Sequence, residues 1–269
     1  MIIDFHVHLT PIPPDREWVW KQWPGTTYSG ITAEDSIAKM DVCKPRIDKT
    51  LAFGAKSLVS ETAQAMTEEN NYILGIVRKY PQRFVGAGVV DASWGDKAIE
   101  ELHRFVEAGL RVVKIRFSSF HFHANSKAGQ RVFSEIEKLG VLPVCHSDWT
   151  HYSNPLILGD LAMMFPELKM VIQHFGEYLS LDAMSVAKKA DNIYVDTSAL
   201  VHPKNVIKFM KEISPDRIMF ASDTLSIRGG LQPQDALDRI LCLDLPKNDL
   251  DKVLGDNAVN LLRSVGVKT

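Results

Sequence analysis

Eight short apolar segments recur along the chain, and each is rich in Val, Ile, Leu or Phe at consecutive positions. Successive side chains of a strand point to opposite faces, so such segments predict strands that are buried on both faces, as in a parallel sheet. We expect strands at Ile2–His8, Lys49–Gly54, Phe84–Val90, Leu110–Phe117, Val141–His146, Lys169–His174, Ile193–Thr197 and Arg217–Asp223.

Several segments between these strands have the 3.6-residue period of amphipathic helices. The clearest are Glu69–Tyr80, Lys97–Ala108 and Lys127–Leu139. Gly109 and Gly140 stand where the last two of these helices should end before the next strand. The alternation of eight strands with helices predicts the α/β class and a (β/α)8 TIM barrel, as a single domain over residues 1–269.

Composition excludes some classes of function. The formal net charge is -2 and no long basic run occurs, so binding to nucleic acid or to a membrane surface has no electrostatic support. No apolar stretch is long enough to cross a membrane. The first strand begins at residue 2 and the chain has only 3 cysteines, so we expect a cytoplasmic protein without a targeting peptide.

The first predicted strand carries two histidines two residues apart, His6 and His8. This spacing places them on one face of a strand, about 7 Å apart, where both could reach one metal ion. The pattern is weak by itself, because it also occurs at His121 and His123 in a segment that reads as loop.

Chemistry in a TIM barrel lies at the carboxyl ends of its strands. Lys114 and Arg116 lie near the end of the fourth predicted strand, His146 ends the fifth, His174 the sixth and Asp223 the eighth. Imidazole and carboxylate groups are usual ligands of a divalent metal, most simply zinc, with manganese as an alternative. The sequence therefore predicts a metal site at this end of the barrel.

With these residues in view, the sequence resembles the amidohydrolase superfamily, and within it the amidohydrolase-related branch that includes aminocarboxymuconate semialdehyde decarboxylase. The resemblance covers nearly the whole chain, and its specificity comes from the order and spacing of its motifs. They are the stretches 3–8 (IDFHVH), 79–86 (KYPQRFVG), 113–115 (VKI), His146, 171–176 (VIQHFG), 192–198 (NIYVDTS), 217–223 (RIMFASD) and 255–258 (GDNA).

The resemblance implies a role for each strand-end residue. His6, His8 and His146 would bind the metal, and Asp223 would be an axial ligand or an acid/base. His174 would lie beside the metal as an acid/base or electrophile. The imidazole of His174 can hydrogen-bond to a substrate carbonyl or to bound water, and the carboxylate of Asp223 can accept a proton from that water.

Two further residues have open interpretations. Lys114 occupies a place similar to that of the carboxylated lysine that bridges two metals in binuclear members, but a lysine that packs or pairs structurally is the simpler interpretation. Asp4 is expected on the face of His6, deeper in the barrel, in a hydrogen-bonding role.

The chain departs from the family pattern where substrate contacts are expected. Arg116 and Phe117 stand where the family often has His-Pro, which puts any transfer of substrate from known members in doubt. Arg116 could bind a substrate carboxylate. Trp18, in the long irregular stretch 10–31, and His121 could line the substrate pocket, although packing or solvated roles are equally ordinary for such loop residues.

The leading hypothesis is hydrolysis of a small amide, ester or lactone, carrying a carboxylate, by metal-activated water. The alternative is non-oxidative decarboxylation of an unsaturated or aromatic acid at the same residues. A metal kept only for stability is disfavoured, because a structural zinc needs no extra acid/base such as His174 or Asp223. The expected partner is a small-molecule substrate, and a homodimer is common in families of this kind.

Overall fold

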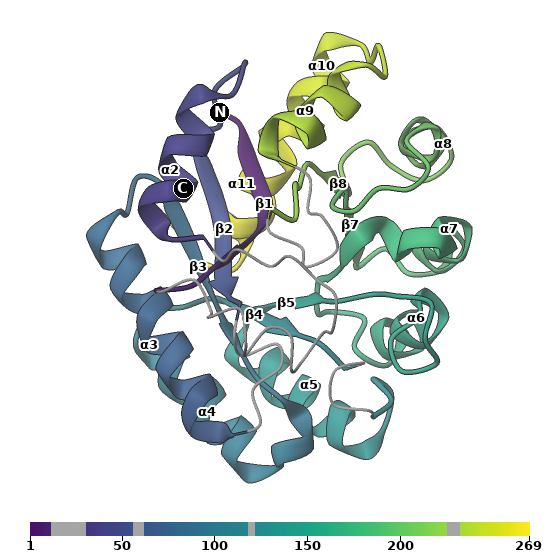
Figure 1. Ribbon diagram of the computed structural model, residues 1–269. Helices are drawn as coiled ribbons and strands as arrows, with labels where there is room; N and C mark the ends of the chain where they lie inside the picture. The colour runs from purple at the N-terminus through teal and green to yellow at the C-terminus, as the bar shows by residue number, and fades with distance from the viewer. Residues whose placement is uncertain (12–30, 56–61, 118–121, 225–231) are drawn as a thin grey trace, which may run out of the picture.

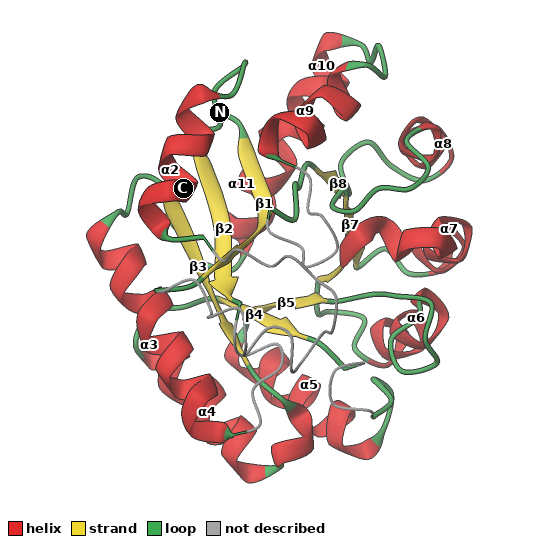
Figure 2. Cartoon of the chain, viewed as in Figure 1, coloured by secondary structure: helices red, strands yellow, loops and turns green. Residues whose placement is uncertain are grey.

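Eight parallel strands form one sheet in chain order, and helices surround it (Figures 1 and 2). The structure is a computed structural model that describes residues 1–11, 31–55, 62–117, 122–224 and 232–269. Each strand pairs in parallel with the next one along the chain. The strands are β1 (Ile3–Leu9), β2 (Lys49–Gly54), β3 (Phe84–Val89), β4 (Val112–Ile115), β5 (Leu142–Cys145), β6 (Met170–Ile172), β7 (Ile193–Asp196) and β8 (Ile218–Met219). The predicted TIM barrel is therefore confirmed.

The helices follow the strands in the order expected of this fold. The three clearest predicted helices are present as α3, α4 and α5, and Gly140 ends α5 in the left-handed conformation that glycine adopts without strain. The helices are α2 (Ala33–Val42), α3 (Ala63–Lys79), α4 (Asp96–Glu107), α5 (Lys127–Leu139), α6 (Pro155–Met164), α7 (Ser180–Lys189), α8 (Lys204–Glu212), α9 (Pro233–Leu241), α10 (Lys247–Asp251) and α11 (Asn257–Ser264). Shorter helical segments are η2 (Ala92–Trp94), η4 (Gln173–Leu179) and η5 (Lys252–Asp256).

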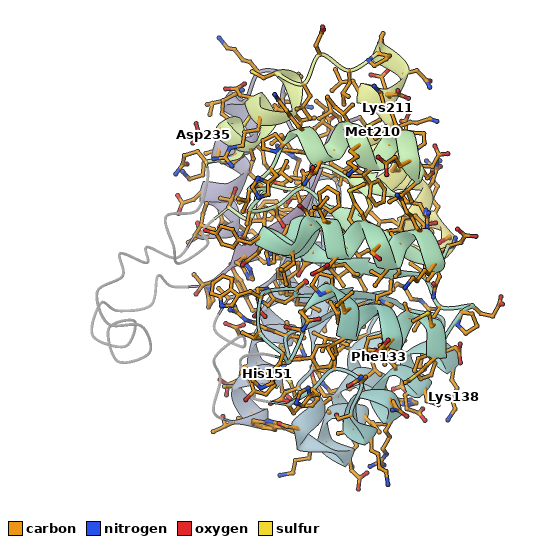
Figure 3. The ribbon with its side chains drawn as sticks, turned by 90° about the vertical axis from the view of Figure 1, so that its right-hand side faces the viewer. Phe133, Lys138, His151, Met210, Lys211 and Asp235 are labelled. Atoms are coloured by element: carbon orange, nitrogen blue, oxygen red, sulfur yellow. The ribbon has the colours of Figure 1, made fainter. Side chains whose placement is uncertain are left out.

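The alternation of side chains along the strands divides the core into two layers. Val113 and Ile115 of β4 belong to the layer between sheet and helices, whereas Val112 belongs to the layer inside the barrel. On the helices, one face packs inward: Phe133 of α5 is buried and Lys138 of the same helix is exposed (both labelled in Figure 3). The alternation on β4 gives Lys114 and Arg116 the same inward direction as Val112.

A bulge in β1 changes which side chains point into the barrel. The register with β2 shifts between Asp4 and Val7. Ile3 and Phe5 belong to the inner layer, but Val7 belongs to the outer one. A bulge inserts one residue and so reverses the alternation beyond it. His6 and His8 therefore point inward, and Asp4 does not share their face, which corrects the prediction from strict two-residue alternation.

The barrel closes between β1 and the segment after β8. The backbone N–H of Phe5 donates to the carbonyl oxygen of Phe220 at 2.9 Å, and that of Asp223 donates to His6 at 3.0 Å. Val7 and Thr224 form an isolated parallel bridge. This closure brings His6 and Asp223, which lie near opposite ends of the sequence, side by side.

Three of the predicted site residues lie just beyond their strands rather than at the last strand positions. His146 follows β5 by one residue, His174 follows β6 by two and Asp223 follows β8 by four. The strands end early because the backbone turns: His174 and Asp223 have φ angles of 60° and 53°, which a strand cannot contain. Among the described residues, no helix combines the length and the hydropathy needed to span a membrane.

Asn70 of α3 anchors the end of β3, and we predict that its loss destabilises the barrel. Its amide nitrogen donates to the Val89 carbonyl at 3.0 Å, and its oxygen accepts from the Val89 N–H at 2.7 Å. Asn70→Ala leaves both buried backbone groups unpaired, at a cost of roughly 2–4 kcal/mol in the free energy of unfolding. Urea denaturation measures this, with exposed Asn71→Ala as the control that should change stability by under about 0.5 kcal/mol. Equal effects of the two substitutions would contradict the anchoring role.

Candidate metal centre

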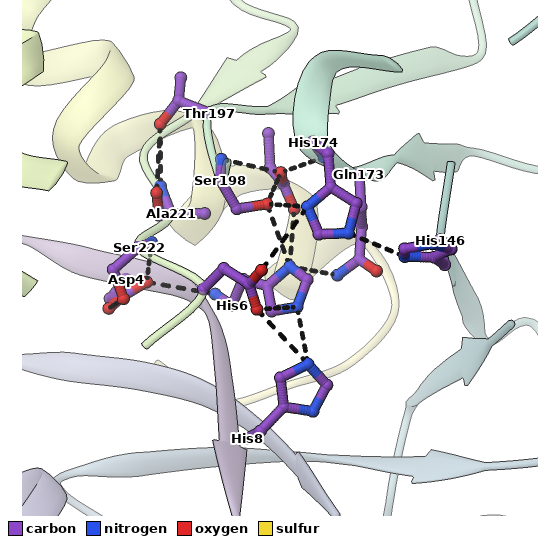
Figure 4. Close-up of polar contacts among 12 residues, drawn as sticks. Asp4, His6, His8, His146, Gln173, His174, Thr197, Ser198, Ala221 and Ser222 are labelled. Carbon is purple, nitrogen blue, oxygen red and sulfur yellow. Dashed lines mark hydrogen bonds and ion pairs between the residues drawn. The ribbon is translucent and has the colours of Figure 1, made fainter. Parts of the chain in front are cut away.

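Three side-chain atoms from opposite ends of the chain converge beside β1 (Figure 4). His6 Nε2 lies 3.1 Å from His8 Nε2 and 3.1 Å from Asp223 Oδ1, and His8 Nε2 lies 3.5 Å from the same oxygen. His6, His8 and Asp223 are all buried. Strand β1 supplies both histidines, and the closure between β1 and the end of β8 supplies the carboxylate.

These residues fit a divalent metal ion. Ligands about 2.0–2.1 Å from a tetrahedral zinc ion are about 3.3 Å from one another, which matches the three separations. His8 Nδ1 is buried and has no hydrogen-bond partner among the described residues. Two imidazoles and a carboxylate form a donor set that zinc and manganese accept. Among the described residues, this is one of two groups of three side chains whose ligand atoms lie close enough to share an ion.

The electrostatics of the group favour an anionic Asp223 carboxylate and a neutral His8 imidazole. Burial raises the pKa of Asp223, but the charge and hydrogen bond of His6 outweigh it, so the pKa falls far below its usual range. Burial lowers the pKa of His6, but the nearby Asp223 charge outweighs this and the net pKa is raised. Burial and the neighbouring His6 charge hold the pKa of His8 well below its usual value. A neutral His8 can coordinate a metal without first losing a proton.

A second polar group adjoins the opposite side of the His6 ring. Ser198 Oγ lies 3.1 Å from His6 Nδ1 and 2.5 Å from Asp196 Oδ1, and the Gln173 amide lies 2.9 Å from His6 Nδ1. Sequence reasoning matched the stretch containing Asp196 and Ser198 to a family motif but assigned these residues no role. The signal that could have identified them is their position at the end of the seventh apolar segment, the barrel end where site residues gather.

His146 and His174 contact each other at the carboxyl ends of β5 and β6. His146 Nδ1 lies 2.8 Å from His174 Nε2, and His146 Nε2 lies 3.3 Å from Asp148 Oδ2. Burial lowers the pKa of His146 to about 3 and that of His174 well below its usual value. His174 Nδ1 lies 4.0 Å from Asp223 Oδ2, which joins this pair to the convergent group. His146 is not in either of the two groups of three, so its role as a ligand stays a prediction.

Lys114 and Arg116 extend the site along β4. The Lys114 side chain is buried, with Nζ 4.8 Å from the centre of the Phe53 ring, and burial lowers its pKa to about 7. Arg116 is partly buried, and its charge contributes to lowering the pKa of His146 and of His8. An electrostatic influence on both histidines means that its positive charge lies near the site. Trp18 and His121, predicted as substrate contacts, lie outside the described residues.

The chain is similar to solved protein structures over almost its whole length. An uncharacterised TIM-barrel protein from Bordetella bronchiseptica is 17% identical, with a TM-score of 0.81 over 99% of each chain. The 2,6-dihydroxybenzoate decarboxylase from Rhizobium is 17% identical, with a TM-score of 0.75 over 98% of this chain and 99% of the enzyme. A 5-carboxyvanillate decarboxylase from Novosphingobium aromaticivorans, with bound manganese and 3-methoxy-4-hydroxy-5-nitrobenzoic acid, is 14% identical, with a TM-score of 0.75 over 99% and 97%. At these identities the likeness concerns the fold.

The sequence itself decides the family. The family model described as Amidohydrolase matches residues 3–264, from the first strand to the last helix. That span includes the convergent His6, His8 and Asp223, the His146–His174 pair and the Asp196–Ser198 group. The chain therefore belongs to this amidohydrolase family.

Proposed function

We propose that the chain is a metal-dependent hydrolase of small amides, esters or lactones that carry a carboxylate. The observation that supports this most directly is the buried group of His6, His8 and Asp223, whose ligand atoms are 3.1–3.5 Å apart. Arg116 supports the proposed carboxylate on the substrate, because its positive charge acts on His146 and His8 and a guanidinium pairs well with a carboxylate.

His6, His8 and Asp223 would hold the ion, and we propose His146 as a further ligand. Zinc and manganese both suit these donors, and manganese is bound in one structurally similar enzyme. When bound, a divalent ion supplies Lewis acidity, which polarises a carbonyl group and lowers the pKa of coordinated water.

The chain's own residues would move the proton. Hydrolysis adds water to the substrate carbonyl carbon and breaks the bond to the leaving nitrogen or oxygen. Asp223 is ionised, and its Oδ2 could accept the proton that water loses and pass it to the leaving atom. Burial holds the pKa of His174 well below its usual value, so this ring is neutral at neutral pH and could accept a proton or a hydrogen bond in the same step.

Decarboxylation is the second candidate, favoured by two structurally similar enzymes whose names carry that activity. In this reaction an acid protonates the ring or alkene carbon, and the bond from that carbon to the carboxylate breaks to release carbon dioxide. Arg116 and the same buried acid/base groups would serve it equally well. The substrate screen below separates the two reactions.

Metal loading is the first test. Protein incubated with zinc or manganese and then desalted should hold about one equivalent by elemental analysis, because one group of ligands converges on one position. His8→Ala should lower the metal content well below that of the wild type. His202→Ala, at an exposed histidine, should not change it. Equal loss in both variants, or no binding by the wild type, would contradict the proposed site, and two equivalents would assign Lys114 to a second metal.

The pH dependence of metal affinity is the second test. Against the opposing effect of burial, the nearby Asp223 charge raises the pKa of His6, so below that pKa the ring carries a proton that the metal must displace. The pKa values of His8 and His146 are lowered, so neither adds a proton to the exchange. Affinity should fall about tenfold per pH unit once the pH drops below the raised pKa of His6, because one proton is displaced for each ion bound. Chelator competition measures this slope, and a slope near three would contradict the assignment.

Turnover is the third test. Asp223→Asn should keep the fold, because asparagine tolerates the positive φ of this position, and should lower kcat by about 100-fold or more. The activity to measure comes from a screen of lactones, amides, esters and aromatic acids, read for both acid release and carbon dioxide. Acid release without carbon dioxide would support the hydrolase, and the reverse the decarboxylase. Full activity in Asp223→Asn would exclude the proton-transfer role.

A further inference from the structure

The Ser198 hydroxyl lies at the centre of a buried polar cluster behind the candidate metal centre. Its Oγ is 2.5 Å from Asp196 Oδ1, 3.0 Å from His174 Nδ1 and 3.1 Å from His6 Nδ1 (Figure 4). These three partners of Ser198 are also the second group whose ligand atoms could share an ion. Because the hydroxyl oxygen is within hydrogen-bond distance of all three, it occupies the position that an ion would need. The cluster is therefore a hydrogen-bond network.

The direction of the Asp196–Ser198 hydrogen bond follows from the hydrogen bonds that the Asp196 carboxylate already accepts. Its Oδ1 already accepts the backbone N–H groups of His174 at 2.8 Å and Ser198 at 3.1 Å. A carboxylate has no proton to give, so the Ser198 hydroxyl donates to it. The Ser198 oxygen is then left with lone pairs for the two imidazoles.

We propose that Asp196 and Ser198 form a positioning pair that holds the protons of His6 and His174 on Nδ1. The inference rests on the proposed function in one respect: the lone pair that this tautomer leaves on His6 Nε2 would bind the proposed metal. With its proton on Nδ1, His6 presents a lone pair at Nε2, the atom that faces His8 and Asp223. His174 likewise has a lone pair at Nε2, so in the resting site it accepts a proton or hydrogen bond there and does not donate one.

The same order of protons extends to His146. His174 Nε2 lies 2.8 Å from His146 Nδ1, so a lone pair on the first atom requires the proton on the second. His146 then has a lone pair at Nε2, 3.3 Å from the Asp148 carboxylate. The order of protons on His6 and His174 thus fixes that of His146, which follows β5.

Gln173 reinforces the same tautomer of His6. Its amide is assigned with Nε2 at 2.9 Å from His6 Nδ1, while its Oε1 is buried and has no hydrogen-bond partner among the described residues. A half-turn of the amide exchanges two atoms of nearly equal size and gives the Nδ1 proton a second acceptor. Gln173 and Ser198 would then both hold the proton away from the metal-facing nitrogen.

The proton positions can be measured directly by NMR. Protein labelled with 15N only in histidine, with the His6 and His174 signals assigned from His6→Asn and His174→Asn, should show both rings as Nδ1–H tautomers. The metal-free protein is measured at about pH 9, where neutral imidazole is the expected form, and the zinc-loaded protein is measured alongside it. An Nε2–H tautomer in either ring of the metal-free wild type would overturn the proposal, whether or not the protein binds zinc.

Variants test whether Asp196 and Ser198 cause this order. Ser198→Ala and Asp196→Asn should weaken zinc affinity by about 10–100-fold, as loss of partners that orient metal-ligating histidines commonly does. Their His174 signals should shift toward a mixture of tautomers. The matched control is Thr197→Val, which removes a buried hydroxyl that accepts from the Ala221 N–H at 3.0 Å. Among the described residues, the Thr197 hydroxyl bonds to Ala221 and not to either ring, so its variant should keep zinc affinity within about twofold.

The outcomes separate this proposal from the proposed function. Wild-type affinity and unchanged histidine spectra in Ser198→Ala would overturn the positioning role and leave the metal site standing. If the wild type binds no zinc or manganese, the proposed function fails, and the tautomer spectra of the metal-free protein alone decide the positioning role. If both variants fail to fold, the wild-type spectra decide it in the same way.

Discussion

The site depends on one buried carboxylate, that of Asp4. Its Oδ1 accepts the backbone N–H groups of His6 at 3.2 Å and Ser222 at 2.8 Å, and its Oδ2 accepts the Ser222 hydroxyl at 2.5 Å. The first bond pairs a backbone group that the bulge in β1 displaces, and the other two hold the segment that leads into Asp223. Burial raises the pKa of Asp4 to about 6, against the opposing effect of these hydrogen bonds. A group this costly to bury is tolerated because it pairs several polar groups at the barrel closure.

Two structural consequences follow from that closure. The bulge directs His6 and His8 into the barrel, whereas a regular strand with Ile3 and Phe5 facing inward would have directed them outward. The bonds to Ser222 place the next residue, Asp223, within 3.5 Å of both imidazoles. Polar groups in this setting interact more strongly than they would in water, because little solvent screens them. Asp4 pairs the backbone N–H of His6, and Ser198 contacts Nδ1 of its ring, so both ends of this residue are held by buried polar groups.

Much of the fold could be read from the sequence, because a doubly buried strand and an amphipathic helix each have a distinct hydrophobic period. The positions of His146, His174 and Asp223 were close to correct for the same reason, since barrel topology gathers strand ends at one face. Asp4 was assigned to the wrong face because a bulge has no signature in the alternation of apolar residues. Asp196 and Ser198 received no role because the sequence does not distinguish the roles of an aspartate or serine near a strand end. Such a residue can bind a ligand, orient another side chain or cap a backbone group.

The sequence by itself therefore determined the class of fold, the family and the set of side chains that could hold a metal, because these follow from periodicity and from motifs in order along the chain. Only the tertiary structure decided which of those atoms meet. The distance between His6 Nε2 and Asp223 Oδ1 joins residues at opposite ends of the chain, and it is set by barrel closure and by one inserted residue. The position of the proton on each imidazole also depends on contacts between strands. Each ring nitrogen donates or accepts according to its hydrogen-bond partner, and these partners are remote in sequence.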